Sequence, residues 1–324
     1  MARIGRRRLI AAASSLALPA IAHAQTDWPN RPVRIIIPYA AGGGTDFTVR
    51  NVAERLSRQT GQQFVVEHRG GAAGALGTEA VVKAPPDGYT MLMTPQAPIQ
   101  LLPQLRKLPY DVNSDLVVVG RMAEQIAGFA VHPSVGVTTL KDFVELARRN
   151  PGKFSFGTAG VGSVNHLRVE TLKLMAGIDL LHVPYRGVGE ALPDLLAGVI
   201  HMMVDSNVLP AAKAGKLTLI SVLTQECYSE FPEVMTMKEQ GFPDYDVPVW
   251  FGAYFASGVP RPIIEKAHRE IATIHTDKEF QDKLFAGGSF VYREALSLPD
   301  MQAHVARQSA RFADLIKRAN IKLD

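Results

Sequence analysis

Two short glycine-rich segments carry the chemistry that this sequence can support. Each follows a predicted strand and precedes a predicted helix: Pro38 to Asp46 (PYAAGGGTD) and Gly157 to Ser163 (GTAGVGS). Glycine lets the backbone approach a ligand closely. The start of the following helix offers free N–H groups and the positive end of its dipole, which suits an anion. This duplication predicts two halves of one anion-binding site.

The residue types in these turns narrow the class of anion. Neither turn has the Gly-Lys-Ser/Thr ending of a phosphate loop or the G-x-G-x-x-G pattern of a dinucleotide site. Neither contains Lys or Arg, which favours a small carboxylate held by neutral donors. In open α/β sheets such turns lie at the carboxyl ends of strands, where ligands bind. We therefore expect both turns to face one cleft.

Three further polar residues are candidates for the same cleft. Asp205 ends an apolar strand, where it either orients a ligand hydroxyl or amine or caps the next helix. His166 lies in the first turn of the helix after Ser163, as a buried structural residue or as a ligand contact. Thr94 follows a strand, so it either lines the cleft or has a structural role, and the sequence does not favour one of these over the other.

The elements that must position these residues alternate between strand and helix, which is the pattern of a layered α/β fold. Two amphipathic helices, at 261–286 and 298–319, close the chain. The remaining strands are predicted at 33–38, 63–67, 89–94, 117–119, 129–131, 153–156, 180–183, 201–205 and 218–222, and the remaining helices at 47–59, 78–83, 139–149, 164–176, 189–197 and around Pro210.

Two domains are the better interpretation of this length and pattern. We expect residues 25–128 plus 251–324 to form one domain and residues 129–250 the other. The Pro- and Gly-rich region 242–262 marks the return, and the apolar segment Val249 to Ala256 is predicted as a strand that crosses between the domains.

The first twenty-four residues have the features of a secretory signal peptide. Four arginines precede an apolar run from Leu9 to Ile21, which ends in Ala22-His23-Ala24. This run falls short of the roughly 20 apolar residues that a transmembrane helix needs. The arginines Arg6 to Arg8 also permit a twin-arginine signal. We expect a periplasmic protein that is cleaved after Ala24.

Cleavage changes the charge of the chain and the partners it suggests. The full chain carries 35 Lys+Arg against 31 Asp+Glu, and the four arginines of the signal leave 31 against 31. No basic cluster with interleaved aromatic residues follows, so we expect no nucleic-acid partner. Cys227 is the single cysteine, which rules out an intrachain disulfide. Neither H-E-x-x-H nor C-x-x-C occurs, and we expect no metal and no cofactor.

The chain resembles the Bug (tripartite tricarboxylate transporter) solute-binding receptors. The similarity begins with RPVRIIIPYAAGGGTD, from Arg31 to Asp46, and continues in order over essentially the whole mature chain. This collinearity is more specific than any single motif. The other matching segments are Pro86 to Thr90, Leu108 to Asp111, Asn150 to Lys153, His182 to Gly187, Trp250 to Gly252 and Ala256 to Pro260.

The resemblance implies a two-domain periplasmic-binding-protein fold (type II-like) with a ligand cleft between the domains. It implies a monomer that closes on a small carboxylate, such as a mono- or dicarboxylate, an amino acid or an aromatic acid. A membrane transporter is the implied partner, and no residue is catalytic. The substrate-binding positions it implies, with Thr94 added from the residue analysis, are Tyr39, Ala40, Gly42, Gly43, Gly44, Thr45, Asp46, Thr94, Thr158, Ala159, Gly160, Gly162, Ser163, His166 and Asp205.

Some positions depart from the family's pattern. Glu67-His68-Arg69-Gly70-Gly71 stands where Glu-Asn-Arg-Pro-Gly is usual, and Gly189-Glu190-Ala191 replaces a small residue followed by Pro-Ala. Glu226-Cys227 lies in a loop that normally carries basic residues. His68 and Glu190 are therefore predicted to alter the rim of the cleft, so one member's ligand does not transfer directly.

Two other functions compete with a transport receptor. An exported serine hydrolase would use Ser163 with His166 as its base, although the G-x-S-x-G elbow is missing. An orphan receptor would instead report ligand occupancy to a sensor kinase, and the receptor sequence alone does not separate transport from sensing.

Overall fold

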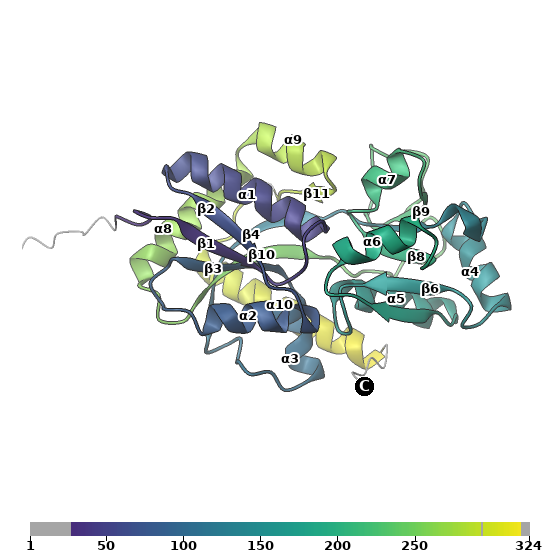
Figure 1. Ribbon diagram of the computed structural model, residues 1–324, viewed down its shortest axis with the longest axis horizontal. Helices are drawn as coiled ribbons and strands as arrows, with labels where there is room; N and C mark the ends of the chain where they lie inside the picture. Colours follow the sequence, from purple (N-terminus) through teal and green to yellow (C-terminus); the bar gives the residue numbers. More distant parts are fainter. Residues whose placement is uncertain (1–26, 293, 319–324) are drawn as a thin grey trace, which may run out of the picture.

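A computed structural model describes residues 27–292 and 294–318 as two α/β lobes (Figure 1). The predicted signal segment, residues 1–24, lies outside the described residues. One lobe is built on a six-stranded sheet and the other on a five-stranded sheet. Here they are called the first lobe and the second lobe, and the domain boundaries given above stay a prediction.

The first sheet has the strand order β11-β4-β10-β3-β1-β2. The interior strand β1, which lies between β3 and the edge strand β2, is VRIII. Its β-branched side chains are buried on both faces of the sheet, as expected of a covered parallel strand. β1 is parallel to β2 and β3, whereas β10 is antiparallel to both β3 and β4. The strands are β1 (Val33–Ile37), β2 (Phe64–His68), β3 (Thr90–Pro95), β4 (Leu116–Gln125), β10 (Trp250–Ala256) and β11 (Ser289–Phe290).

The helices of the first lobe come from both ends of the chain. α1 ends at Gly61, whose φ of 71° and N–H bond to the Ser57 carbonyl form a left-handed helix stop. The 3-10 turn η1 (Ala72–Gly74) and the π-helical turn η2 (Ala97–Leu101) lie beside the sheet. The helices are α1 (Gly44–Thr60), α2 (Ala75–Val82), α3 (Leu102–Leu105), α8 (Arg261–Ala272), α9 (Lys278–Ala286) and α10 (Leu298–Arg318).

The second sheet has the strand order β7-β6-β8-β5-β9, with β6 parallel to β7 and β8 and with β5 antiparallel to its neighbours. Thr139 caps α4 by accepting from the Asp142 N–H, and α4 buries Leu140, Phe143, Val144 and Ala147 on one face. The elements are β5 (Gly128–Val131), β6 (Ser155–Thr158), β7 (Leu181–Pro184), β8 (Met202–Asp205), β9 (Thr218–Val222), α4 (Leu140–Arg149), α5 (Val164–Ala176), α6 (Val188–Leu196) and α7 (Leu209–Lys213).

Four predicted elements differ most from the structure. The strand predicted at 117–119 is part of the ten-residue β4, whose second half was missed because Arg121 and Glu124 interrupt its apolar run. α1 begins at Gly44 rather than Phe47, because its cap is Gly43, which has no side chain to signal it. The predicted helix 261–286 is divided, since Asp277 accepts from the Phe280 N–H and starts α9 separately. β10 does not cross between the lobes: it lies inside the first sheet, and the crossings are residues 126–127 and the long segment 223–249 that precedes it.

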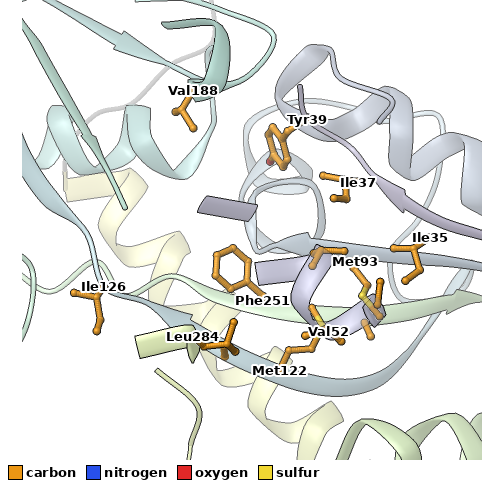
Figure 2. Packing of buried hydrophobic residues seen from close by; sticks show 14 of the residues in the cluster. Ile35, Ile37, Tyr39, Val52, Met93, Met122, Ile126, Val188, Phe251 and Leu284 are labelled. Carbon is orange, nitrogen blue, oxygen red and sulfur yellow. The ribbon is translucent and has the colours of Figure 1, made fainter. Parts of the chain in front are cut away.

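Apolar packing continues from one lobe into the other. One cluster contains Ile35 and Phe251 of the first lobe together with Val188 of the second, and Figure 2 shows Val188 approaching Tyr39 and Phe251. The last helix, α10 (yellow in Figure 1), also joins the lobes. Its Met301 packs with first-lobe residues, and its Phe312 packs in the second lobe's cluster.

Candidate functional site

The first glycine turn, between β1 and α1, is held closed by Asp46. The Gly42 N–H donates to Asp46 Oδ2 at 3.0 Å, and Gly42 has a φ of 84° that a residue with a side chain adopts at a cost. Arg50 Nε and His68 Nε2 both lie within hydrogen-bond distance of Asp46 Oδ1, at 2.7 and 2.8 Å. The Asp46 carboxylate is thus used inside its own lobe, and His68 is one of its supports.

The start of α1 has no side-chain cap of its own. Gly43 is the N-cap residue, in extended conformation with φ −92° and ψ 172°. The acceptor at this helix start comes from the other lobe instead: the Gly44 N–H donates to Asp205 Oδ1 at 3.1 Å. A carboxylate at a helix N-terminus is favoured by the free N–H groups and by the helix dipole.

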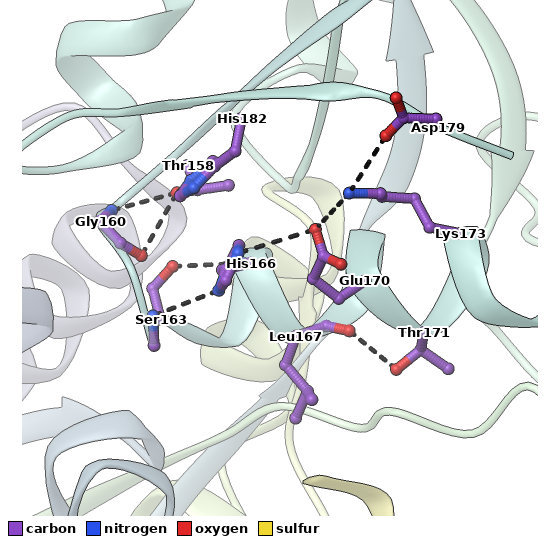
Figure 3. A network of polar contacts seen from close by, with 11 residues as sticks. Thr158, Gly160, Ser163, His166, Leu167, Glu170, Thr171, Lys173, Asp179 and His182 are labelled. Carbon is purple, nitrogen blue, oxygen red and sulfur yellow. Dashed lines mark hydrogen bonds and ion pairs between the residues drawn. The ribbon is translucent and has the colours of Figure 1, made fainter. Parts of the chain in front are cut away.

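The second glycine turn, between β6 and α5, is capped by its own side chains (Figure 3). Ser163 Oγ accepts from the His166 N–H at 3.2 Å, and His166 Nδ1 accepts from the Gly162 N–H at 3.3 Å. Thr158 Oγ1 accepts from the Gly160 N–H at 3.1 Å and lies 2.6 Å from His182 Nε2. The Ser163 hydroxyl is therefore a helix cap, and its bond to His166 is to the backbone rather than to the imidazole.

Two stacked histidine rings lie beside this second turn. His166 and His182 stack with 4.2 Å between ring centroids, and Phe156 stacks on His182 at 4.9 Å. Burial lowers the pKa of each imidazole to about 4, and for His182 the neighbouring His166 adds to this effect. Both rings are neutral near pH 7, which keeps His166 Nδ1 available as an acceptor.

Asp205 is the point at which the two lobes are tied together. Besides the Gly44 N–H, Oδ1 accepts from the Asn207 N–H at 3.1 Å. Oδ2 accepts from Gln125 Nε2 at 2.9 Å and from Asn165 Nδ2 at 3.1 Å. Four donors surround this carboxylate, which is 4% exposed, so hydrogen bonds from both lobes fix its orientation.

Two glycines of the second lobe let the first turn approach closely. A Cβ on Gly187 would lie 2.7 Å from Ala40 N, and a Cβ on Gly189 would lie 1.8 Å from the Ala41 carbonyl oxygen. Gly187 has a φ of −177°, which any residue adopts, so the close contact rather than the backbone conformation requires glycine there. The predicted rim residue Glu190 lies next to this contact and accepts from the Arg186 N–H at 3.3 Å.

A small cavity, called the front cavity here, remains between the two turns. It measures about 20 Å³, which is little more than the space of one water molecule. The predicted residues that line it are Tyr39, Ala40, Gly43, Thr45, Ala159 and Asp205. The lining residues that sequence reasoning missed are Pro95, Gln125, Val164, Asn165, Val188, Val249 and Phe251.

The other predicted residues lie behind this lining. Thr94 is fully buried and donates to the Pro95 carbonyl at 3.0 Å, so the residue after it, Pro95, reaches the cavity instead. The structure gives the remaining predicted positions roles within the turns rather than on the cavity surface; these are Gly42, Gly44, Asp46, Thr158, Gly160, Gly162, Ser163 and His166. A ligand role for any of the fifteen stays a prediction.

Three of the missed residues lay beside predicted ones in the sequence: Val164 and Asn165 follow Ser163 at the start of a helix, and Pro95 follows Thr94. Gln125, Val249 and Phe251 carried no such signal, since they lie far from both turns in the sequence and reach the cavity only through the fold. Within residues 27–292 and 294–318, no group of three or more His, Cys, Asp or Glu is arranged to hold a metal ion. A search of the same residues finds no helix long and apolar enough to span a membrane.

Comparison with known proteins identifies the family. Residues 48–321 match the model of the tripartite tricarboxylate transporter family receptor. The chain belongs to this family. Its members are solute-binding receptors rather than enzymes, so the hydrolase alternative has no support.

Three solved members of the family resemble the chain closely. The periplasmic binding protein BugD superposes with a TM-score of 0.87 at 30% identity, covering 91% of this chain and 99% of BugD. R. palustris Rpa4515 with adipate gives 0.86 at 31% identity, covering 91% and 99% of the two chains. MatC from Rhodopseudomonas palustris with bound malate gives 0.83 at 26% identity, covering 89% and 99%. The predicted two-domain periplasmic-binding-protein fold is thus confirmed.

Proposed function

We propose that this receptor captures a small carboxylate in the front cavity, between the two glycine turns. The observation that carries the proposal is the chemistry of the lining, which has backbone groups of both turns, the Asn165 and Gln125 amides, and no Lys or Arg. Its one carboxylate, Asp205, accepts from both of these amides in this arrangement, so a ligand carboxylate would take its place as their acceptor. Neutral donors at two helix starts suit a carboxylate. The relatives solved with adipate and malate support the same ligand class.

Ligand entry requires the two lobes to separate. The front cavity is too small for adipate or malate, and the contacts of Gly44 with Asp205 and of Gly189 with Ala41 close it. The lobes are joined by residues 126–127, by the segment 223–249 and by α10, so a rotation about these connections opens the turns. A ligand that bridges both turns would then stabilise, by its differential affinity, a ligand-bound state in which the turns lie further apart than they do here.

The proposed cellular role is that of an exported receptor that delivers its ligand to a membrane transporter. The receptor is exported by its N-terminal signal, cleaved after Ala24 by the general or the twin-arginine route. It presents its ligand to the membrane subunits of a tripartite tricarboxylate-type transporter. If instead it serves a sensor kinase, the purified closed receptor will bind that kinase's periplasmic domain and not the transporter's membrane subunits.

A thermal-shift screen of mature protein that has been unfolded and refolded tests the ligand class. Adipate, malate, monocarboxylates, tricarboxylates and amino acids are compared with neutral diols and amides. A ligand at a hundredfold excess over Kd raises the free energy of unfolding by about 2.7 kcal/mol. We expect shifts from carboxylates only; shifts from neutral analogues alone would overturn the proposal.

The variant Gly43→Val tests whether the carboxylate binds in the front cavity. A Cβ at Gly43 would lie 2.7 Å from Val188 Cγ2 inside the front cavity, and its extended backbone accepts valine. We expect the carboxylate shift to disappear while the circular dichroism spectrum is unchanged. Ala303→Val, on an exposed position of α10, is the matched control and should keep the shift. A full shift in Gly43→Val would show that the ligand binds elsewhere.

A further inference from the structure

A second and larger cavity lies where the two lobes are joined. It measures about 410 Å³, within the range of small-molecule sites, and is called the hinge cavity here. Its wall includes Glu124 to Ile126 at the end of β4 and Val247 to Pro248 before β10, which are the flanks of both connections between the sheets. Phe285 and Phe290 contribute from the first lobe. Any occupant would therefore contact both lobes and both connections.

A buried arginine forms part of this wall. Arg168, on α5, is 1% exposed and lines the hinge cavity. Its Nε donates to the Val247 carbonyl at 3.2 Å and its Nη1 to Gln125 Oε1 at 2.7 Å. Both acceptors are neutral, and a guanidinium has five N–H groups to donate. The acidic groups that act on Arg168 are Asp205, which it reaches through Gln125, and Glu124. Neither is hydrogen-bonded to the guanidinium, so an anion placed against its remaining N–H groups would be stabilised.

The acidic group on the same wall does not replace that anion. Glu124 is bonded to the Tyr292 hydroxyl, and burial raises the pKa of Glu124, which favours its neutral form. Asp246, at the rim, is paired with Arg311. The exposed Lys238 adds a positive charge at the rim, opposed there by Glu226. The rest of the wall is largely aromatic and apolar, including Tyr228, Met237, Phe242, Tyr245, Phe285 and Phe290.

We propose that the hinge cavity is a second binding site, which takes an organic monoanion with an aromatic or branched apolar body and places its anionic group against Arg168. The site is separate from the front cavity and does not depend on which carboxylate binds there.

The two cavities are connected by hydrogen bonds. Arg168 donates to Gln125, Gln125 donates to Asp205, and Asp205 accepts from Gly44 at the front. An anion on Arg168 bridges both lobes in the arrangement in which the front turns meet. It therefore favours the arrangement in which the front cavity is about 20 Å³, which is too small for adipate or malate. By linkage, the hinge anion and a front ligand of that size lower each other's affinity.

Cys227 provides a reporter within the hinge cavity itself. It is the single cysteine of the chain, it is exposed, and it lines this cavity. The experiment measures the rate at which neutral iodoacetamide alkylates Cys227, by intact mass, in mature protein with 4-phenylbutyrate or with neutral 4-phenylbutan-1-ol. We expect the anion to slow alkylation at least about threefold at saturation and the alcohol to have little effect, because only the anion pairs with Arg168.

Variants identify the charge that is responsible. Arg168→Met should abolish protection. Because it also removes two buried hydrogen bonds, the exposed Lys238→Glu is tested beside it. Lys238→Glu should raise the concentration for half-protection about tenfold. Lys141→Glu, exposed on α4, is the matched control and should leave it unchanged. The proposal would be overturned if the alcohol protected as well as the anion, or if neither protected. It would also be overturned if Lys238→Glu left the half-protection concentration unchanged and a folded Arg168→Met were still protected.

The front-site variant separates this proposal from the proposed function. In Gly43→Val, protection of Cys227 by 4-phenylbutyrate should persist, because the substituted residue does not line the hinge cavity. Protection that is lost together with the front ligand would place the anion at the front and would refute the second site. Persistent protection with no carboxylate shift in the wild type would instead uphold the hinge site and refute the proposed ligand class.

Discussion

The two glycine turns both connect a strand to a helix, but the acceptors at the starts of the two helices come from different places. In the second turn, Ser163 caps its own helix and His166 accepts from Gly162. In the first turn, the helix start has no side-chain cap, and its Gly44 N–H bonds with Asp205 of the opposite lobe. The second turn is therefore complete within its own lobe, whereas the first is complete only when the lobes meet.

This difference assigns the two turns unequal parts in closure. A self-capped turn keeps its shape whether the lobes are apart or together. A turn that lacks a cap gains a hydrogen bond with a carboxylate on closure, and a ligand carboxylate competes for or extends the same contact. Four changes test this contrast. They remove the Asp205 carboxylate, block the contact of Gly189 with Ala41, protonate the two histidines beside the second turn, and remove the Ser163 cap.

Among the substitutions, removing the Asp205 carboxylate that accepts from the first turn should have the largest effect. In Asp205→Ala, four donors around a buried site lose their acceptor, so we expect the free energy of unfolding to fall by roughly 2–4 kcal/mol. Urea denaturation measures it. Asp179→Ala, at an exposed carboxylate 4.0 Å from Lys173, should change stability by less than about 0.5 kcal/mol. Similar values for the two variants would show that the tie between the lobes is weak.

Blocking the approach should separate the lobes without unfolding either one. Gly189→Ala places a Cβ 1.8 Å from the Ala41 carbonyl oxygen, and we expect this overpacking to cost about 1–3 kcal/mol of the closed state. Small-angle X-ray scattering of ligand-free protein should then give a larger radius of gyration with an unchanged circular dichroism spectrum. Leu196→Ala, at the other end of α6, serves as control. An unchanged radius would mean that the turns do not need this contact.

Acid should weaken the second turn through its buried histidines. The pKa of His166 and of His182 is about 4 in the folded protein, against about 6.5 in an unfolded chain. Between these values the unfolded chain binds more protons, so stability present above pH 6.5 is lost as the pH falls toward 4, by at most about 1.4 kcal/mol per pH unit for each histidine. Urea midpoints at pH 7 and 4.5 measure this loss. The double variant His166→Gln/His182→Gln should lose less; an equal loss would assign the effect to other groups.

Removing the cap of the second turn should have the smallest effect. Ser163→Ala leaves the His166 N–H without its acceptor and should lower the free energy of unfolding by about 1 kcal/mol. The reciprocal change, Gly43→Ser, gives the first turn a cap, but its Cβ would lie 2.7 Å from Val188 Cγ2, so it is made in a Val188→Ala background and compared with Val188→Ala alone. In that background it should alter stability by only a few tenths of a kcal/mol. Thermal unfolding of both variants sharpens the contrast. A larger loss in Gly43→Ser than in Ser163→Ala would reverse it.

The sequence predicted what depends on local pattern. The bounds of α5 and β9 agree with the predictions, because Ser163 and Gly177 bound the helix and β-branched residues fill the strand. The predicted start of α1 was wrong, since a glycine cap has no polar side chain that the sequence could reveal. The cavity lining was only half predicted, because Gln125, Val188 and Phe251 come together through contacts between lobes that no local pattern encodes.

The position of β10 in the first sheet also affects the newly synthesised chain. β3 and β4 do not pair with each other; β10 fills the gap between them and arrives only at residues 250–256, after every strand of the second sheet. Until then both neighbours expose an unpaired, largely apolar edge, which is a template for aggregation. A fragment that stops before Trp250 retains a complete second sheet and a split first one. We expect such a fragment to aggregate through those two edges unless a chaperone covers them.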